Sequence, residues 1–167
     1  RPVLVAGSTH EADENVLIPA FAELLESLPT ALLILVPRHP ERFARTAELA
    51  KTAGLRTEMH SQGEACSEQA QCFVIDTMGE LMTYYACGDI AYVGGSMGEQ
   101  GGHNALEPAA LGLPVLFGPN MENAKEIAAK LVESHAAFFV NHQNELREIA
   151  ENCSEMTIYV TAWVMRV

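Results

Sequence analysis

Residues 89–118 read DIAYVGGSMGEQGGHNALEPAALGLPVLFG, and this stretch decides the fold class. The apolar run Asp89–Val93 predicts a buried strand, and Gly94–Gly102 follows as a loop with five glycines. His103–Leu111 has the composition of a helix, and Pro114–Phe117 predicts the next strand. A strand, a helix and a second strand in this order form a βα unit, whose strands lie parallel.

The same alternation continues outward in both directions. Further strands are expected at Val3–Ala6, Ala31–Val36, Leu55–Glu58, Cys72–Ile75 and Ala137–Val140, and further helices at Asp13–Leu28, Pro40–Ala53, Gly79–Ala86, Met121–Ser134 and Gln143–Asn152. The sequence therefore predicts an α/β fold, a Rossmann-like parallel sheet with helices on both faces. We expect one ligand-binding domain over residues 1–153, followed by a tail, 154–167, whose apolar pattern does not define its structure.

Composition limits the function. The chain has 167 residues, 49% hydrophobic and 19% charged, which favours one globular domain and excludes a disordered chain. Ten basic against 22 acidic residues give a net charge of −12, which argues against a nucleic-acid partner. A small phosphate ligand stays compatible, because it needs only backbone N–H groups and one or two cations. Neither a membrane span nor a signal peptide is expected from the apolar runs.

The cysteines and histidines do not form a recognisable metal motif. Cys66, Cys72, Cys87 and Cys153 lack C-x-x-C spacing and a histidine at zinc-site spacing, so free thiols are expected, with a disulfide or a metal site as the alternative. The histidines at positions 10, 39 and 103 follow three different predicted strands and define no ligand set. We therefore predict no bound metal.

Polar segments follow five of the predicted strands. Ligands of doubly wound sheets bind beyond the carboxyl ends of the strands, where the strand order reverses, so these segments predict one site. The segments are GSTHE (7–11), PRHP (37–40), DTMGE (76–80), the glycine-rich loop with His103 and Asn104, and GPN (118–120).

The glycine-rich loop has a physical use in binding. Glycine lets the backbone approach a ligand closely, and the start of the next helix offers free N–H groups, so the pair suits phosphate. The pattern is neither G-x-G-x-x-G nor a Walker loop, and a plain strand–helix turn is the alternative.

Individual side chains strengthen this prediction. Glu107 lies one helical turn after Asn104, so a carboxylate on the same side can accept hydrogen bonds from ribose hydroxyls; a solvated acid is the alternative. Arg38 stands between two prolines, which suits binding of a phosphate or carboxylate, against a plain surface arginine. Ser8 and Thr9 either contact the ligand or cap the following helix, with Glu11 completing a capping box.

Together these motifs resemble a known family. The stretch of about Pro2–Glu151 is similar to the carboxyl-terminal domain of the 3-deoxy-D-manno-octulosonic acid (Kdo) transferases. The segments that carry the resemblance are GSTHE, VPRHPERF, DTMGEL, VGGS…GGHNALEPAALGLPVLFGP and N-x-K-E-I. Two departures stand out. Ala12-Asp13-Glu14 replaces the usual Gly-Glu-Glu, and the tail from Ser154 does not resemble the closing helix of the family.

The resemblance implies the carboxyl-terminal half of a two-domain GT-B glycosyltransferase that moves Kdo from CMP-Kdo to a lipid A precursor in lipopolysaccharide biosynthesis. This half would bind CMP-Kdo or CMP, without a metal or other cofactor. The amino-terminal half would supply the membrane anchor, the acceptor site and a carboxylate general base, at the cytoplasmic face of the bacterial inner membrane. No catalytic residue is then expected in this chain, and the isolated domain is expected to be inactive.

The resemblance also implies roles for individual residues. Arg38 would contact the donor, the backbone of Met78 and Gly79 would meet the cytosine ring, and Glu107 would bind the ribose. Ser8 and Thr9 would border the phosphate or the Kdo. The phosphate and sugar-acid loop would comprise Ser96, Gly101, Gly102 and Asn104. Two other functions stay open: a UDP-sugar transferase or epimerase, which CMP against UDP binding would distinguish, and a nucleotide-binding module without catalysis.

Overall fold

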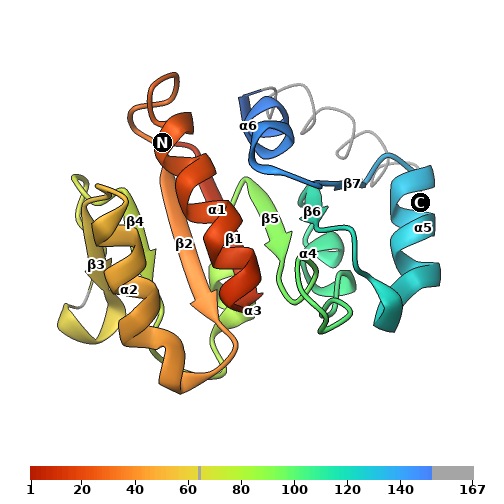
Figure 1. Cartoon of the computed structure of the whole chain (residues 1–167), viewed down its shortest axis with the longest axis horizontal. Helices are drawn as coiled ribbons and strands as arrows, with labels where there is room; N and C mark the ends of the chain where they lie inside the picture. The colour runs from red at the N-terminus through yellow and green to blue at the C-terminus, as the bar shows by residue number, and fades with distance from the viewer. Residues whose placement is uncertain (64, 152–167) are drawn as a thin grey trace.

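The structure is a computed structural model that describes residues 1–63 and 65–151. Seven parallel strands form one sheet in the order β3-β4-β2-β1-β5-β6-β7 (Figure 1). The strands are β1 Val3–Thr9, β2 Leu32–Pro37, β3 Thr57–Met59, β4 Cys72–Val74, β5 Ile90–Val93, β6 Val115–Phe117 and β7 Ala137–Phe139. The helices are α1 Glu11–Leu24, α2 Phe43–Thr52, α3 Leu81–Tyr85, α4 Leu106–Ala110, α5 Lys125–Glu133 and α6 Gln143–Glu151, with short 3₁₀ turns η1 Pro40–Arg42, η2 His60–Gln62 and η3 Glu122–Ala124.

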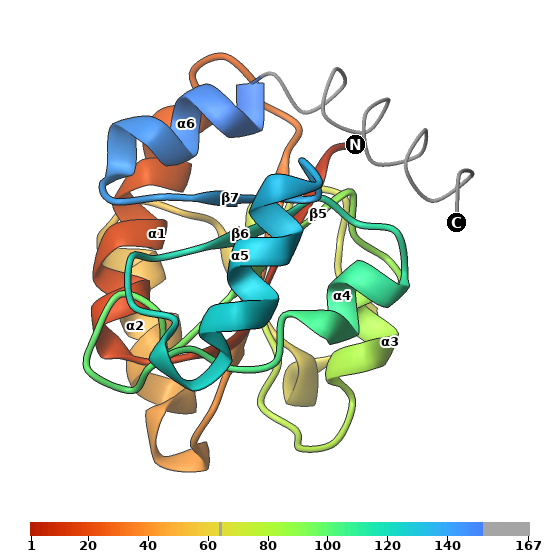
Figure 2. The same cartoon turned by 90° about the vertical axis from the view of Figure 1, so that its right-hand side faces the viewer.

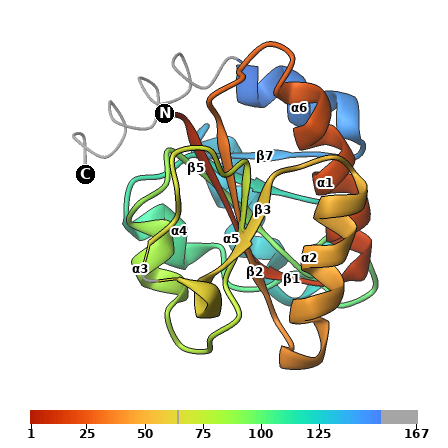
Figure 3. The ribbon, with the colours of Figure 1, turned by 90° about the vertical axis from the view of Figure 1, so that its left-hand side faces the viewer.

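Helices cover both faces of the sheet. Figures 2 and 3 show α1, α2 and α6 on one side and α3 and α4 on the other. Helix α5 packs against β6 and β7 through a cluster that contains Leu131, Val115 and Ala137. The predicted fold class is confirmed.

The side chains of β2 explain why its apolar run is continuous. Leu33 and Leu35 point into the core beneath α1 and α2, and Ile34 points into the core on the opposite face. Successive residues of a strand face opposite sides, so a strand covered on both sides needs apolar residues at every position.

Strand β1 lies at the point where the strand order reverses. Leu4 pairs with Leu33 of β2 on one side and with Ile90 of β5 on the other. Chain connections leave β1 and β5 in opposite directions across the sheet, which opens a crevice at their carboxyl ends. The predicted polar segments all follow strands at this edge.

Several helix boundaries differ from the prediction, and two of these differences have a clear structural cause. Helix α1 ends at Leu24 rather than at Leu28, because the chain turns there while Leu28 still packs against the core and so continues the apolar pattern. Helix α4 begins at Leu106 rather than at His103, because the amide of His103 donates to the carbonyl of Gly94 and the side chain of Asn104 accepts from the amide of Leu106. The short α4 therefore offers no helix dipole to the glycine-rich loop itself.

Cysteines 66, 72 and 87 are free thiols, and Cys153 lies outside the described residues, as does the predicted tail 154–167. Burial raises the pKa of Cys72 to about 12, so this thiol stays protonated and inert. Across the described part of the chain, no helix combines the length and the apolar character that crossing a membrane requires.

Candidate functional site

A hollow of about 150 Å³ lies at the carboxyl edge of the sheet. The carboxyl ends of β1 and β2, the loop after β4 and the first residue of α3 form it. Its lining residues are Ser8, Val36, Pro37, Arg38, Thr77, Met78, Gly79 and Leu81. Four predicted site residues, Ser8, Arg38, Met78 and Gly79, thus line one hollow although they are far apart in the sequence.

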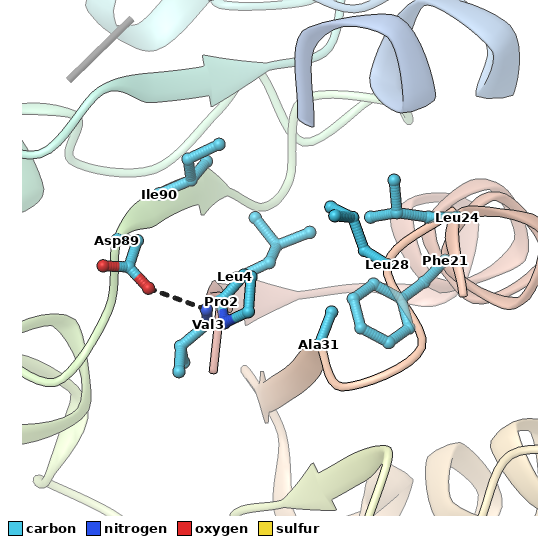
Figure 4. Close-up of a pocket in the computed structure, with 9 residues that line it drawn as sticks. All are labelled: Pro2, Val3, Leu4, Phe21, Leu24, Leu28, Ala31, Asp89 and Ile90. Atoms are coloured by element: carbon cyan, nitrogen blue, oxygen red, sulfur yellow. Dashed lines mark hydrogen bonds between the residues drawn. The ribbon is translucent and has the colours of Figure 1, made fainter. Parts of the chain in front are cut away.

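Another hollow lies at the opposite end of β1 and has a different character (Figure 4). It measures about 30 Å³ and is lined by apolar side chains, among them Phe21, Leu24 and Leu28. Its one charged group, Asp89, accepts a hydrogen bond from the amide of Val3 at 2.8 Å. A space of this size holds about one water molecule, so the carboxyl-edge hollow is the candidate site.

Arg38 brings an unneutralised positive charge to the hollow. Its backbone amide donates to the carbonyl of Thr9 at 3.0 Å, which fixes the loop after β2 against the end of β1. Its side chain is exposed, and within residues 1–63 and 65–151 the guanidinium has no acceptor or ion-pair partner. A free guanidinium of this kind is suited to bidentate binding of phosphate or carboxylate.

An ion pair fixes the turn that follows Arg38. Arg42, in η1, donates to the buried carboxylate of Glu14 at 2.5 Å and lies 3.8 Å from Glu11. The hydrogen bond with Glu14 raises the pKa of Arg42. The other oxygen of Glu14 accepts from the hydroxyl of Thr9 at 3.1 Å. Thr9 is fully buried, so its side chain stabilises the protein beneath the site and does not face a ligand.

Met78 and Gly79 form the exposed side of the hollow. Met78 is 55% exposed, and Gly79 has a left-handed φ of 88° with open space where a Cβ would stand. Thr77 donates to the carboxylate of Glu80, and His60 lies 3.8 Å from the same carboxylate. The loop after β4 is thus tied down at its base while its tip faces solvent.

Asp13 anchors the glycine-rich loop, and sequence reasoning missed this role. Its buried carboxylate accepts hydrogen bonds from the hydroxyl of Tyr92 at 3.0 Å and from the amides of Gly95 at 2.8 Å, Ser96 at 3.3 Å and Met97 at 3.0 Å. These consecutive amides form a concave donor surface of the kind that binds anions. Asp13 already occupies that surface, so the three amides are not available to a phosphate.

Asp13 also caps α1. It accepts a hydrogen bond from the amide of His10, the N-cap residue, at 2.9 Å. The capping box considered for Ser8 and Glu11 does not form, because β1 extends to Thr9 and moves the helix start beyond Ser8. Ser8 instead has a left-handed φ of 54° and is half-buried at the hollow.

Ser96 ties two loops together below the site. Its hydroxyl donates to the carbonyl of Val93 at 2.6 Å and accepts from the amide of Gly118 at 2.7 Å. The residue is fully buried, so the structure directs its side chain to the loop after β6 and away from solvent. Gly94 permits the parallel approach of β1 and β5, since a Cβ there would lie 2.3 Å from the carbonyl oxygen of Ser8.

Gly101 and Gly102 have left-handed φ values of 80° and 77°, and both are buried. The side-chain amide of Asn123 donates to the carbonyl of Gly102 at 3.4 Å and to that of Gln100 at 2.7 Å. The far end of the glycine-rich loop is therefore held against the turn before α5.

Asn104 and Glu107 lie on the same side of the chain, as predicted. The amide of Asn104 donates to the carboxylate of Glu107 at 3.3 Å, although Asn104 precedes the helix instead of lying within it. Burial raises the pKa of Tyr85 in the neighbouring α3, and the charge of Glu107 raises it further. Glu107 is half-buried and retains carboxylate oxygen capacity for a ligand.

Three histidines from different loops meet beside Arg38. The Nε2 atoms of His10 and His103 lie 2.9 Å apart, and the ring of His39 contacts His10 edge-on at a centroid distance of 5.3 Å. The sequence placed these histidines on three different loops and defined no ligand set from them. The structure brings the rings together because the ends of β1, β2 and β5 are adjacent in the sheet. In the described residues, no group of three or more histidine, cysteine or acidic side chains is arranged to hold a metal ion.

Burial lowers the pKa of both His10 and His103. The charge of Asp13 opposes this effect on both rings, and the neighbouring histidines and Arg38 reinforce it. Both rings are therefore neutral near pH 7.

A parallel sheet with this strand order, a glycine-rich loop after β5 and a hollow at the switch point are features of a Rossmann-like domain. The likeness to solved structures identifies this one as the carboxyl-terminal domain of a GT-B glycosyltransferase. The C-terminal domain of a group 1 glycosyl transferase (LpcC) from Francisella tularensis shares the fold, with a TM-score of 0.63 at 14% identity over 95% of this chain and 80% of that one. The C-terminal CMP-Kdo binding domain of WaaA from Acinetobacter baumannii aligns with a TM-score of 0.88 at 31% identity, over 98% of this chain and 89% of that domain. The chain belongs to the Kdo transferase family.

Curated relatives agree with this assignment. The 3-deoxy-D-manno-octulosonic acid transferase of Haemophilus influenzae is 41% identical over 150 residues, which are 90% of this chain and 35% of that protein. The enzyme of the same name from Rickettsia felis is 33% identical over 87% of this chain and 31% of its own length. The chain thus spans about a third of the length of the curated relatives that it matches. No protein-family model matches the chain.

Proposed function

We propose that this domain binds CMP-Kdo and that, within a full-length enzyme, it presents the Kdo group for transfer to a lipid A precursor. The observation that carries the proposal is the hollow at the carboxyl edge, which Arg38 lines together with the exposed residues Met78 and Gly79. The likeness to the CMP-Kdo binding domain of WaaA supports the choice of ligand.

Arg38 is the group best suited to the charged part of the ligand. The cradle formed by the amides of Gly95, Ser96 and Met97 is already filled by Asp13, so the phosphate needs a cation from elsewhere. A guanidinium bound to a phosphate forms charge-assisted hydrogen bonds. We therefore assign phosphate binding to Arg38, whereas the sequence had assigned it to the glycine-rich loop.

The other predicted residues fit around this anchor. The backbone of Met78 and Gly79 is exposed and free to meet the edge of a cytosine ring, while the carboxylate of Glu107 suits ribose hydroxyls. Ser8 lines the hollow between these parts. Thr9 and Ser96 are assigned a supporting role, because their hydroxyls are used inside the protein.

Transfer itself requires a second half. A base must lie within hydrogen-bond reach of the acceptor hydroxyl, and both substrates must be fixed in one cleft. Of the acids around the candidate site, Glu107 is assigned to the ribose. Four more accept hydrogen bonds from protein groups: Asp13, Glu14, Asp76 and Glu80. We assign the base, the lipid A precursor site and the contact with the inner membrane to an amino-terminal domain, and we assign no metal or cofactor to the transfer.

Titration of the isotope-labelled chain with CMP tests the binding proposal. Half of the cleft wall is absent from this chain, so we expect weak binding, with a dissociation constant on the order of 1 mM. Amide signals of Arg38, Met78, Gly79 and Glu107 should move, and UMP should move them less. Equal or stronger shifts with UMP would favour a UDP-sugar enzyme, and no shift with either nucleotide would contradict the proposal.

A transfer assay tests the division of labour. The chain alone should form no Kdo-bearing lipid from CMP-Kdo and a lipid A precursor, as judged by mass spectrometry. Product above a blank without protein would mean that a base lies in this chain. Binding of CMP without any turnover after an amino-terminal half is added would favour a binding module.

A further inference from the structure

The contact between His10 and His103 has a geometry that limits its protons. The two ring planes differ by 5°, and the centroids are 5.1 Å apart while the Nε2 atoms are only 2.9 Å apart. The rings therefore meet edge to edge, nitrogen to nitrogen, instead of stacking face to face. One proton fits between the two nitrogens, and two would repel each other.

The surroundings keep the pair in this position. His10 is the N-cap of α1, and its amide is held by Asp13. His103 follows Gly102 and lies against Gly95, where a Cβ would come within 2.8 Å of the His103 ring. Both residues are half-buried, so part of each remains exposed at the surface.

The charges around the pair are asymmetric. Arg38 and His39 face it from the loop after β2, and Asp13 and Glu14 face it from α1. The two acids are buried and already accept hydrogen bonds from amides, hydroxyls and Arg42. The groups left to meet a ligand on this side are therefore Arg38 and histidines, which are cationic or can become so.

We propose that the His10–His103 pair, together with Arg38, forms the subsite for an acidic group of the bound donor and takes up one proton when that group binds. The inference rests on the proposed function, because a CMP-linked sugar acid carries both a phosphate and a carboxylate. Either anion has the same requirement, a hydrogen-bond donor with positive charge.

The proton balance is simple. In the neutral pair, one ring donates its Nε2–H to the unprotonated Nε2 of the other. The added proton comes from solvent and binds to Nδ1 of the donating ring, which becomes an imidazolium. The hydrogen bond between the rings is kept and becomes charge-assisted, and no covalent bond between heavy atoms changes. An anion beside the pair favours the charged form and so raises its pKa.

Ring signals in NMR spectra of the unmodified chain test this directly. The pKa values of His10 and His103 are measured with no ligand, with cytidine, with CMP and with free Kdo. Cytidine should leave them unchanged, because it carries no acidic group. If CMP raises these pKa values and free Kdo does not, the subsite binds the phosphate. If free Kdo raises them and CMP does not, the subsite binds the carboxylate. Either result supports the proposal.

The same titration separates the two proposals. If CMP binds but neither CMP nor free Kdo moves the pKa of either ring, the subsite is overturned while the proposed function stands. If CMP fails to bind while free Kdo raises the pKa values, the subsite stands and nucleotide binding by this domain fails. If neither ligand binds at millimolar concentration, both proposals are contradicted.

A variant provides an independent readout. His103→Gln removes the ring but leaves a neutral donor, so the affinity for the effective anion should fall about ten-fold at pH 6 and only roughly two-fold at pH 8. His142→Gln is the matched control, because His142 is exposed and lies before α6, away from the hollow. Equal losses for His103→Gln at both pH values would contradict proton uptake.

Discussion

Two loops at the carboxyl edge of the sheet are built on different principles. The glycine-rich loop after β5 is buried along Gly94–Ser96, and the buried carboxylate of Asp13 holds it through three amides. The loop after β4 exposes Met78 and Gly79 and is tied at its base, where Thr77 donates to Glu80 and Asp76 accepts from the amide of Ser61. The site therefore combines one wall fixed by the core with one wall that is free to follow a ligand.

Asp13→Ala should have the largest effect on this contrast. It leaves the hydroxyl of Tyr92 and the amides of Gly95 and Met97 without their acceptor inside the protein. Unpaired buried donors make the expected loss of unfolding free energy about 3–5 kcal/mol, measured by urea denaturation. Glu11→Gln, an exposed change on the same helix, should cost about 0.5 kcal/mol or less. Similar small losses for both variants would mean that Asp13 is not an anchor.

Replacing one glycine in each loop by alanine compares how strongly the two loops resist an added side chain. At Gly94 a Cβ would lie 2.3 Å from the backbone oxygen of Ser8, so β1 and β5 must separate and stability should fall by about 3 kcal/mol. At Gly79 a Cβ meets open space, and only the left-handed φ of 88° opposes it, at about 1 kcal/mol. Thermal unfolding of the two variants under identical conditions measures the difference. The reverse order would contradict the fixed-wall description.

Glu107→Gln tests whether a residue can contribute to ligand binding without contributing to stability. The variant should weaken CMP binding by about 1.5–3 kcal/mol, because a charge-assisted bond to ribose is lost. Its unfolding free energy should hardly change, since among residues 1–63 and 65–151 Glu107 has one side-chain hydrogen bond, from Asn104 at 3.3 Å. Calorimetric titration alongside urea denaturation gives both quantities. Unchanged CMP affinity would exclude the ribose role.

The pH dependence of stability should be the smallest effect. Burial lowers the pKa of His10 and His103 in the folded protein, so the unfolded chain binds more protons as the pH falls through the ordinary histidine range. Stability should therefore be complete above about pH 7 and decrease toward about pH 5. His103→Gln should flatten this decline, as measured by urea midpoints at several pH values. A steeper decline in the variant would show that the pair is not the source.

The fold could be predicted from the sequence because each strand carries a local signal. The run Ala31–Val36 is apolar at every position, and the structure places it between two covered faces, as β2. That Arg38, Met78 and Gly79 lie close together could be predicted for a related reason. They stand in segments that follow strands, and the carboxyl ends of parallel strands share one edge.

The supporting contacts could not be predicted in the same way. Asp13 stands in the first turn of a helix, where an acid ordinarily caps the helix or faces solvent, and nothing near it in the sequence indicates Gly95 or Tyr92. The contact of His10 with His103 joins residues 93 positions apart and depends on the register of β1 against β5. Such pairings appear only when the sheet is assembled.

The long reach of the Asp13 carboxylate has a consequence for the order of folding. Its bonds to the amides of Gly95, Ser96 and Met97 join residues 82 to 84 positions apart, so they close only after β1, α1 and β5 have come together. A partly folded chain has no means of ordering this loop in advance. The loop amides therefore exchange their hydrogens with solvent at the rate set by global opening, like a core strand and unlike an ordinary surface loop. Cooperativity extends to the binding edge, and a chain that has lost its core has lost the site in the same transition.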